Sequence, residues 1–212
     1  MLPEARYLFL NAAVLLTGLC RSDSVSQTPL VIIVTEGDDV QLFCNYTAAA
    51  SNDPNLFWYR QKTSGSVEYL VQRSKYIRNQ ERFPGDRLSS DFDHVNHNIQ
   101  LKVLKTELTD SAVYYCALTT SGGYSKTVFG AGTRLIVKPQ RDSSEPSVYI
   151  LPPYDSDTKN AACLATDYFP QNVSMVVAAG NKKQKQDKSK GLLSTNDRSY
   201  SLTGFLDKLE DP

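Results

Sequence analysis

The stretch DSAVYYCALTTSGGYSKTVFGAG, residues 110–132, joins the end of one strand pattern to the start of another. Alternating residues lead up to Cys116, and the segment closes on Phe129 and two glycines. The twelve residues between them, 117–128, have little apolar content. A segment that is anchored at both ends and whose central residues do not pack in the core is typical of a binding loop on a rigid scaffold. Residues 119–126 are therefore predicted to be unconstrained by the core.

Alternating apolar residues mark short strands along the rest of the chain, between turn signals such as EGDD, NDPN and TSGS. The residues that carry this alternation are Val40, Leu42, Cys44, Tyr46, Ile99, Leu101, Val103, Leu135, Val137, Tyr149 and Leu151. No segment keeps a 3.6-residue apolar period. The pattern predicts an all-β sandwich or barrel.

The first residues have the composition of a secretory signal peptide, predicted to cover residues 1–21. Thirteen nearly all-apolar residues, YLFLNAAVLLTGL, end at Leu19, and the small residues Gly18 and Cys20 occupy plausible −3 and −1 cleavage positions. The run is too short to span a bilayer, and a buried N-terminal helix is the alternative. The chain as a whole is formally neutral, with 23 basic and 23 acidic residues, which argues against a general nucleic-acid or polyanion binder.

A domain boundary is expected in the polar segment KPQRDSSEP, residues 138–146, so that 22–138 and 139–212 form separate domains. Leu209-Glu210-Asp211 echoes Leu108-Thr109-Asp110, which lies six residues before Cys116. The same offset predicts a cysteine near position 217, beyond the given sequence, as the partner of Cys163. A free buried thiol or an intermolecular bridge is the alternative for Cys163.

Cys44, Trp58 and Cys116, with Tyr114 two residues before the second cysteine, have the spacing of an immunoglobulin sandwich. FWYRQ (57–61), DSAVYYC (110–116) and FGAG (129–132) followed by TRLIVKP together resemble a T-cell receptor variable domain with its joining segment. EPSVYILPP and AACLATDYFP resemble the receptor's constant domain. No Trp follows Cys163, whereas antibody, β and γ constant domains usually have one there. In this respect the chain resembles the α and δ chains, and its joining segment resembles that of α chains.

This resemblance implies an all-β fold of immunoglobulin-like β-sandwiches, one V-type domain followed by an incomplete C-type domain. It implies a Cys44–Cys116 disulfide against Trp58, a Tyr114 hydroxyl bonded to backbone, and an Arg87–Asp110 ion pair. The implied function is recognition of peptide presented by a histocompatibility molecule, in a heterodimer with a β chain and with CD3 signalling subunits at the plasma membrane. The alternatives are a δ chain and a non-rearranging V-type adhesion or inhibitory receptor; an enzyme is a distant fourth.

Three loops are expected at one end of the first domain to contact ligand. The residues assigned to them are Ser51, Asn52, Asp53, Asn55, Arg73, Lys75, Tyr76, Thr119, Thr120, Ser121, Gly122, Gly123, Tyr124, Ser125 and Lys126. Because Trp58 points into the core, Tyr59 and Gln61 point to the opposite face, and with Leu70 and Phe129 they are predicted to form the chain-pairing surface. Asn45 and Asn172 begin Asn-x-Ser/Thr glycosylation sequons.

Other motifs favour no chemistry. GGYSKT, residues 122–127, lacks the Gly that a phosphate-binding loop has directly before its Lys. His94 and His97 fall in a predicted turn with no further ligands suggested, so no metal or other cofactor is expected. The lysine-rich segment NKKQKQDKSK, residues 181–190, is expected to be a solvated strand edge or loop whose charges discourage edge-to-edge pairing.

Overall fold

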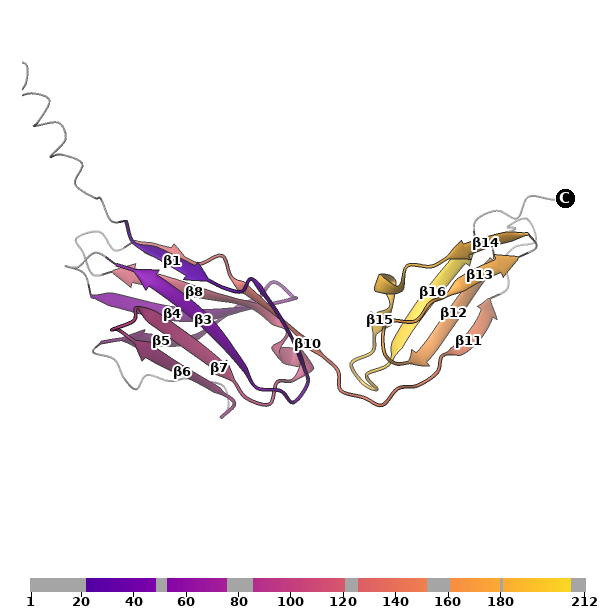
Figure 1. Cartoon of the computed structure of the whole chain (residues 1–212), viewed down its shortest axis with the longest axis horizontal. Helices are drawn as coiled ribbons and strands as arrows, with labels where there is room; N and C mark the ends of the chain where they lie inside the picture. The colour runs from indigo at the N-terminus through magenta and orange to yellow at the C-terminus, as the bar shows by residue number, and fades with distance from the viewer. Residues whose placement is uncertain are drawn as a thin grey trace, which may run out of the picture. The chain divides into compact units, whose positions relative to one another are not determined.

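The computed structural model describes residues 22–48, 53–75, 86–120, 126–151, 161–179 and 181–206 (Figure 1). The chain divides into two compact units between Lys138 and Pro139, and each unit is described by itself. The predicted signal peptide and the Leu209-Glu210-Asp211 echo lie outside the described residues.

The first unit is a sandwich of two sheets. Its elements are β1 (Ser24–Gln27), β2 (Val31–Thr35), β3 (Val40–Thr47), β4 (Pro54–Lys62), β5 (Val67–Ser74), β6 (Leu88–Asp93), β7 (Asn98–Val103), the 3₁₀ turn η1 (Leu108–Asp110), β8 (Ala112–Thr120), β9 (Thr127–Phe129) and β10 (Thr133–Lys138). One sheet has the order β1-β3-β7-β6. The other has the order β2-β10-β8-β4-β5, with β9 added on β8. The predicted all-β immunoglobulin-like sandwich is confirmed.

The core lies between these two sheets and follows the period of two expected for half-buried strands. In β3, Val40, Leu42, Cys44 and Tyr46 are buried and the residues between them are exposed or half-buried. Ile99, Leu101 and Val103 of β7 and Leu135 and Val137 of β10 complete the same interior. Burial of this apolar surface, at about 25 cal/mol per Å², is the main driving force for the domain.

A β-bulge interrupts the pairing of β4 with β5. Trp58 lies opposite Val71, but the next residue, Tyr59, lies opposite Tyr69, so Leu70 has no cross-strand partner. A bulge changes the phase of side-chain alternation along a strand. As a result Leu70 and Val71 both face the core and are fully buried, while Tyr69 is directed to the other face of the sheet.

The second unit contains β11 (Ser147–Leu151), β12 (Ala161–Tyr168), β13 (Val176–Ala179), β14 (Lys182–Lys185), the 3₁₀ turn η2 (Lys188–Lys190), β15 (Leu192–Leu193) and β16 (Tyr200–Leu206). One sheet has the order β11-β12-β16-β15, and β13 and β14 form a hairpin (Figure 1). Ala165, Tyr168, Tyr200 and Leu202 form a small core. The hairpin packs on β16 at Gly204, where an added Cβ would lie 2.7 Å from Val177 Cγ2.

The alternation predicted for β11 is only partly correct. Tyr149 pairs with Leu164 and Leu151 pairs with Ala162, which places both on the sheet face opposite to that of Ala165 and Leu202. Every residue of β11 is exposed, because the strand is at the sheet edge and neither of its faces is covered by the residues that the structure describes. A sequence pattern gives the alternation of a strand but not which of its two faces is covered.

Candidate recognition and pairing surfaces

A disulfide joins the two sheets of the first unit at the predicted positions, Cys44 and Cys116, whose Cα atoms are 6.3 Å apart. Trp58 lies opposite Cys116 in the β4–β8 register and is fully buried. Closing a loop of 72 residues contributes about 4 kcal/mol in the chain-entropy account of disulfides. The disulfide thus joins β3 and β8, the strands that lead into the first and third predicted loops, near their centres.

Tyr114 and Asp110 fix the opposite end of β8. The Tyr114 hydroxyl donates to the backbone oxygen of Asp110 at 2.9 Å, as expected at a tyrosine corner. Burial, together with the nearby Asp110 carboxylate, raises the pKa of Tyr114 to about 12 against the opposing effect of Arg60. The phenol is therefore neutral over the whole physiological range.

The predicted ion pair is present and is part of a larger cluster. Arg87 Nη1 lies 2.7 Å from Asp110 Oδ2, and Asp110 is almost completely buried. Arg60 Nη1 lies 3.6 Å from Asp110 Oδ1, and the amide of Glu107 donates to Asp110 Oδ2 at 2.8 Å. The hydrogen bond with Asp110 raises the pKa of Arg87, which keeps its guanidinium charged.

Gln27 is a functional support that the sequence analysis missed. Its side-chain oxygen accepts from the backbone N–H of Cys116 at 3.0 Å and of Gly132 at 3.1 Å. Its side-chain nitrogen donates to the backbone oxygen of Tyr114 at 2.9 Å. Gly130 leaves room for this carboxamide, since a Cβ there would collide with Gln27 Oε1. The first glycine of FGAG is thus explained by a residue about 100 positions earlier, a relationship with no local sequence signal.

The roots of the three predicted loops meet at one end of the six-stranded sheet. Thr120, at the end of β8, pairs with Pro54 at the start of β4. Asn55, the next residue, pairs with Ser74 at the end of β5. Asp53, Lys75 and Lys126 lie at the loop ends and are exposed. The remaining loop residues that were predicted, Ser51, Asn52, Tyr76, Ser121, Gly122, Gly123, Tyr124 and Ser125, lie outside the described residues.

The third loop is shorter than predicted, because the strands continue into it. Thr119 pairs with Thr127, and the two hydroxyls lie 3.0 Å apart. Thr120 is buried, and its hydroxyl donates to Asp23 Oδ2 at 2.9 Å. The assignment of Thr120 to ligand contact is therefore wrong. Alternation along β8 turns it inward, and Asp23 satisfies the hydroxyl that polarity alone had assigned to the surface.

The assignment of Arg73 to the second loop is also wrong. Arg73 belongs to β5 and is 5% exposed. Its Nε and Nη2 donate to the backbone oxygen of Ser90 in β6 at 3.2 and 3.1 Å. Desolvation by burial lowers the pKa of its guanidinium. Because Arg73 lies opposite the buried Leu56 in β4, it points inward, and its bond to Ser90 links the two sheets. Lys75 is the first exposed residue after it.

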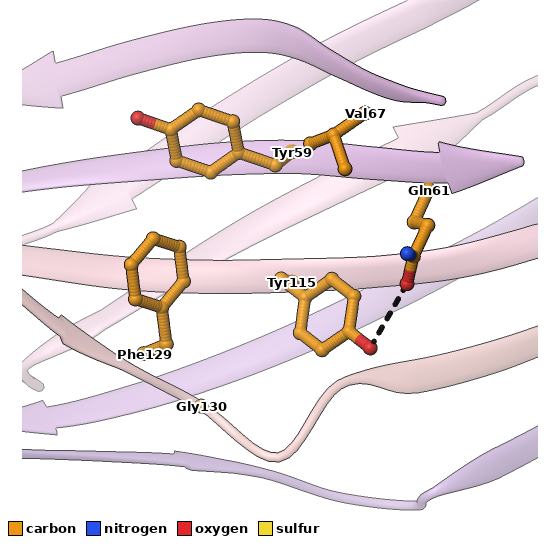
Figure 2. A pocket seen from close by; sticks show the side chains of 6 residues that line it. All are labelled: Tyr59, Gln61, Val67, Tyr115, Phe129 and Gly130. Atoms are coloured by element: carbon orange, nitrogen blue, oxygen red, sulfur yellow. Dashed lines mark hydrogen bonds between the residues drawn. The ribbon is translucent and has the colours of Figure 1, made fainter. Parts of the chain in front are cut away.

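An aromatic surface covers the face of the six-stranded sheet that points away from the core (Figure 2). The ring centroid of Tyr59 lies 5.9 Å from that of Tyr69 and 5.8 Å from that of Phe129. Tyr69 and Phe129 are 47% and 57% exposed. Together with Gln61, Val67, Tyr115 and Gly130, Tyr59 and Phe129 line a hollow of about 440 Å³. This set, with Tyr69, is called the aromatic face below.

Gln61 is held in one orientation within the aromatic face. Its side-chain oxygen accepts from the Tyr115 hydroxyl at 3.3 Å (Figure 2). The second glycine of FGAG supports the same face, since Gly132 has φ +86° and an added Cβ would lie 2.7 Å from Tyr115 Cε1.

Leu70, which was predicted to belong to this face, does not. It is fully buried among the core residues. The bulge after Trp58 inserts one residue into β5, so that Tyr69 takes the outward position that simple alternation gives to Leu70.

Comparison with known proteins identifies the sandwich. The immunoglobulin V-set domain family matches residues 27–138. A human T-cell receptor α chain, MC.7.G5, is 34% identical over 169 residues, which cover 78% of this chain and 60% of that one. The mouse T-cell receptor α chain V region CTL-F3 is 37% identical over 131 residues, 61% of this chain and 94% of that region.

The chain belongs to the T-cell receptor family. A mouse β chain V region, also CTL-F3, is 36% identical over 119 residues, 53% of this chain and 83% of that region, so both halves of the receptor heterodimer are represented among its relatives. This family consists of non-enzymatic antigen-receptor chains with extracellular immunoglobulin domains at the cell surface. Among the described residues, no helix is long and apolar enough to cross a membrane.

The two predicted glycosylation sites of this T-cell receptor chain are exposed, Asn45 on β3 and Asn172 before β13. The side chain of Asn172 accepts a hydrogen bond from Lys188 Nζ. Cys163 is half-buried in β12 and is a free thiol. Its predicted partner near position 217 lies beyond the given sequence.

Proposed function

We propose that this chain is an α chain, that it pairs through the aromatic face with the variable domain of a β chain, and that its three loops bind peptide presented by a histocompatibility molecule. The observation that carries the pairing is the exposure of Tyr69, Phe129 and Val67, at 47, 57 and 60%, on one sheet face, where Phe129 and Val67 also line the hollow. Aromatic side chains gathered on an exposed surface mark a protein interface. The hydrogen bond from Tyr115 orients Gln61 so that its amide can donate to the partner.

A second apolar face in the second unit supports a heterodimer. Tyr149 and Leu151 of β11 and Phe205 of β16 share the outward face of the four-stranded sheet, according to the strand registers. They are 53, 39 and 56% exposed. A constant domain of the partner chain is the occupant that this face would receive.

Co-expression with a β chain from the same species tests the pairing. The expected result is a secreted 1:1 heterodimer, measured by native mass spectrometry. Tyr59→Asp or Phe129→Asp is expected to abolish it, because each buries a charge at the centre of the interface. The matched control is Phe43→Asp, since Phe43 is 41% exposed on the opposite sheet. Equal loss in the control, or an unaffected heterodimer in the Tyr59 and Phe129 variants, would contradict the proposal.

The ligand is tested by exchanging residues 121–125 for those of a receptor chain of known peptide specificity. Because the roots of the loops are fixed by the Pro54–Thr120 and Asn55–Ser74 pairs, the exchange is expected to change ligand choice without loss of folding. Binding is measured with tetramers of peptide-loaded histocompatibility molecules. Unchanged tetramer staining would argue against peptide recognition by this loop.

The second candidate is a δ chain. The α-chain relatives, 34 and 37% identical to this chain, support α. Co-expression with β and γ chains in parallel distinguishes the two, because an α chain pairs with β and a δ chain with γ. Delivery to the plasma membrane with CD3 signalling subunits, and glycans on Asn45 and Asn172, belong to the same proposal. Glycosidase digestion followed by mass spectrometry tests the glycans.

A further inference from the structure

The charge of the second unit is unevenly distributed. Residues 181–190 carry five lysines and one aspartate, a formal charge of +4. The other residues of 139–212 include four basic and nine acidic side chains. Lysines gathered at this density create a local positive potential even where the total charge of a domain is close to zero. Overall neutrality therefore does not exclude binding of a polyanion at this segment.

The β13–β14 hairpin presents part of this charge on one face. Lys183 lies opposite Ala178 and Lys185 lies opposite Val176, and residues that are directly opposite share a face. All four are exposed. The other face of the hairpin is anchored, since Val177 is buried and packs at Gly204 of β16.

Lys183 and Lys185 have no neutralising partner in the part of the chain that the structure describes. No ion pair joins either ammonium group to a described carboxylate. Residues two apart in a strand are separated by about 7 Å. The two lysines therefore form a short row of charge along the strand.

A hollow of about 310 Å³ continues the row beyond the end of β14. It is lined by Asn172, Val173, Ser174, Lys185, Gln186, Asp187 and Lys188. Lys188 donates to the Asn172 side chain, which also lines the hollow. Asp187 brings one negative charge, and its Oδ1 already accepts from the Ser189 amide at 2.9 Å as the cap of η2. The hollow thus combines two ammonium groups with the Ser174 hydroxyl and the Gln186 amide. A glycan on Asn172 would cover this hollow, so heparin binding is measured on protein from which N-linked glycans have been removed.

We propose that the β13–β14 hairpin and η2 form a binding site for a sulfated polysaccharide. Clustered lysines along an extended segment are typical of heparin-binding patches, and a linear polyanion needs only a row of cations to bind. A protein partner fits this surface less well. Protein interfaces are depleted in lysine and depend on aromatic anchors, and residues 181–190 contain none. T-cell receptor chains are cell-surface proteins, so the polyanions that this domain meets are extracellular polysaccharides.

Binding of the purified full chain to immobilised heparin tests the site. Wild-type protein is expected to bind at about 0.1 M NaCl and to be released as the salt concentration rises, because salt screens exposed charges. The variant Lys183→Gln/Lys185→Gln is expected to bind about tenfold more weakly and with a shallower salt dependence, because two fewer charges release counterions. Lys185→Gln/Lys188→Gln tests the hollow and is expected to have a similar effect.

Matched controls separate this site from general charge. Lys102→Gln/Lys138→Gln removes the same charge from exposed positions of the first unit and is expected to leave heparin binding unchanged. Circular dichroism of each variant checks its fold. Equal weakening in the control pair, or wild-type binding in both hairpin variants, overturns the proposal.

Competing soluble probes identify the ligand chemistry. Heparin is expected to compete, whereas desulfated heparin and polyglutamate are not. Competition by polyglutamate in preference to heparin would assign the surface to an acidic polypeptide and overturn the polysaccharide. The site does not depend on chain pairing, and Tyr59→Asp is expected to bind heparin like wild type, so failure of one proposal is distinguishable from failure of the other.

Discussion

The side-chain oxygen of Gln27 accepts a hydrogen bond from the backbone N–H of Cys116, 89 residues later in the chain. This bond and those to Gly132 and Tyr114 tie β1 to the strand that carries the disulfide and to the glycines after the third loop. One buried carboxamide therefore connects the cysteine, the tyrosine and the FGAG segment that mark the fold in the sequence.

Removing this carboxamide is expected to destabilise the first unit. Gln27→Ala leaves two backbone N–H groups and one carbonyl without partners in a buried site, at a cost of about 3 kcal/mol. Gln41, whose side chain is exposed on β3, provides the control, and Gln41→Ala is expected to change stability by less than about 0.5 kcal/mol. Urea unfolding followed by tryptophan fluorescence measures both. Equal stability of the two variants would show that the Gln27 bonds are dispensable.

Asp110 is expected to be the most sensitive member of the charged cluster. Asp110→Ala leaves Arg87 and Arg60 without their shared carboxylate and removes the acceptor of the Glu107 amide, for a loss of about 3–5 kcal/mol. Glu68→Gln breaks ion pairs of 2.7 Å to Arg60 and 2.8 Å to Lys62 at a more exposed site, so a loss below about 1 kcal/mol is expected. Thermal unfolding of both variants gives the comparison, and similar losses would contradict the role of burial.

The stability of the first unit is expected to fall at alkaline pH because of Tyr114. Its pKa is about 12 in the folded chain and 10.0 without the fold. Between these values the folded state keeps a proton that the unfolded state has released. The contribution of Tyr114 to the free energy of unfolding is therefore fully present below pH 10 and is lost as pH rises toward 12. A shift of this size corresponds to about 3 kcal/mol. Tyr114→Phe, unfolded by urea at pH 9 to 11.5, is expected to show a shallower decline, and an unchanged slope would exclude Tyr114 as its source.

Gly132 and Gly65 have the same positive φ, +86°, but different surroundings. Gly65→Ala meets no atom within 4 Å and is expected to cost only the backbone strain, about 1–2 kcal/mol. Gly132→Ala also collides with Tyr115 and Val113, at 2.7 and 2.9 Å, and is expected to cost more and to weaken chain pairing by displacing Tyr115. Melting temperatures and heterodimer yields test this, and equal effects on both would argue against the steric explanation.

Adjacent residues of β5 are expected to affect different properties. Leu70→Ala creates a cavity in the core and is expected to cost about 2–5 kcal/mol of stability. Tyr69→Ala is expected to leave stability nearly unchanged and to reduce heterodimer formation. Denaturant midpoints and native mass spectrometry separate the two effects. If Leu70→Ala kept full stability but paired poorly, Leu70 would belong to the chain-pairing surface after all, contrary to its position at the bulge.

The sequence by itself determined the all-β sandwich, the disulfide between Cys44 and Cys116, the buried Trp58 and the outward direction of Tyr59 and Gln61. These follow from residue spacing and from a side-chain period of two, which are local properties of a strand. The sequence also indicated the receptor family, because FGAG follows Cys116 at a characteristic interval.

Tertiary structure alone decided which neighbouring residues reach the surface. Simple alternation puts Leu70 outward, and polarity does the same for Arg73 and Thr120. The β4–β5 bulge turns Leu70 inward, and the continuation of β5 and β8 as paired strands turns Arg73 and Thr120 inward. Gln27 had no signal at all, because its partners lie 87 to 105 residues away. Register, bulges and long-range hydrogen bonds depend on which strands meet, and only the assembled sheets determine this.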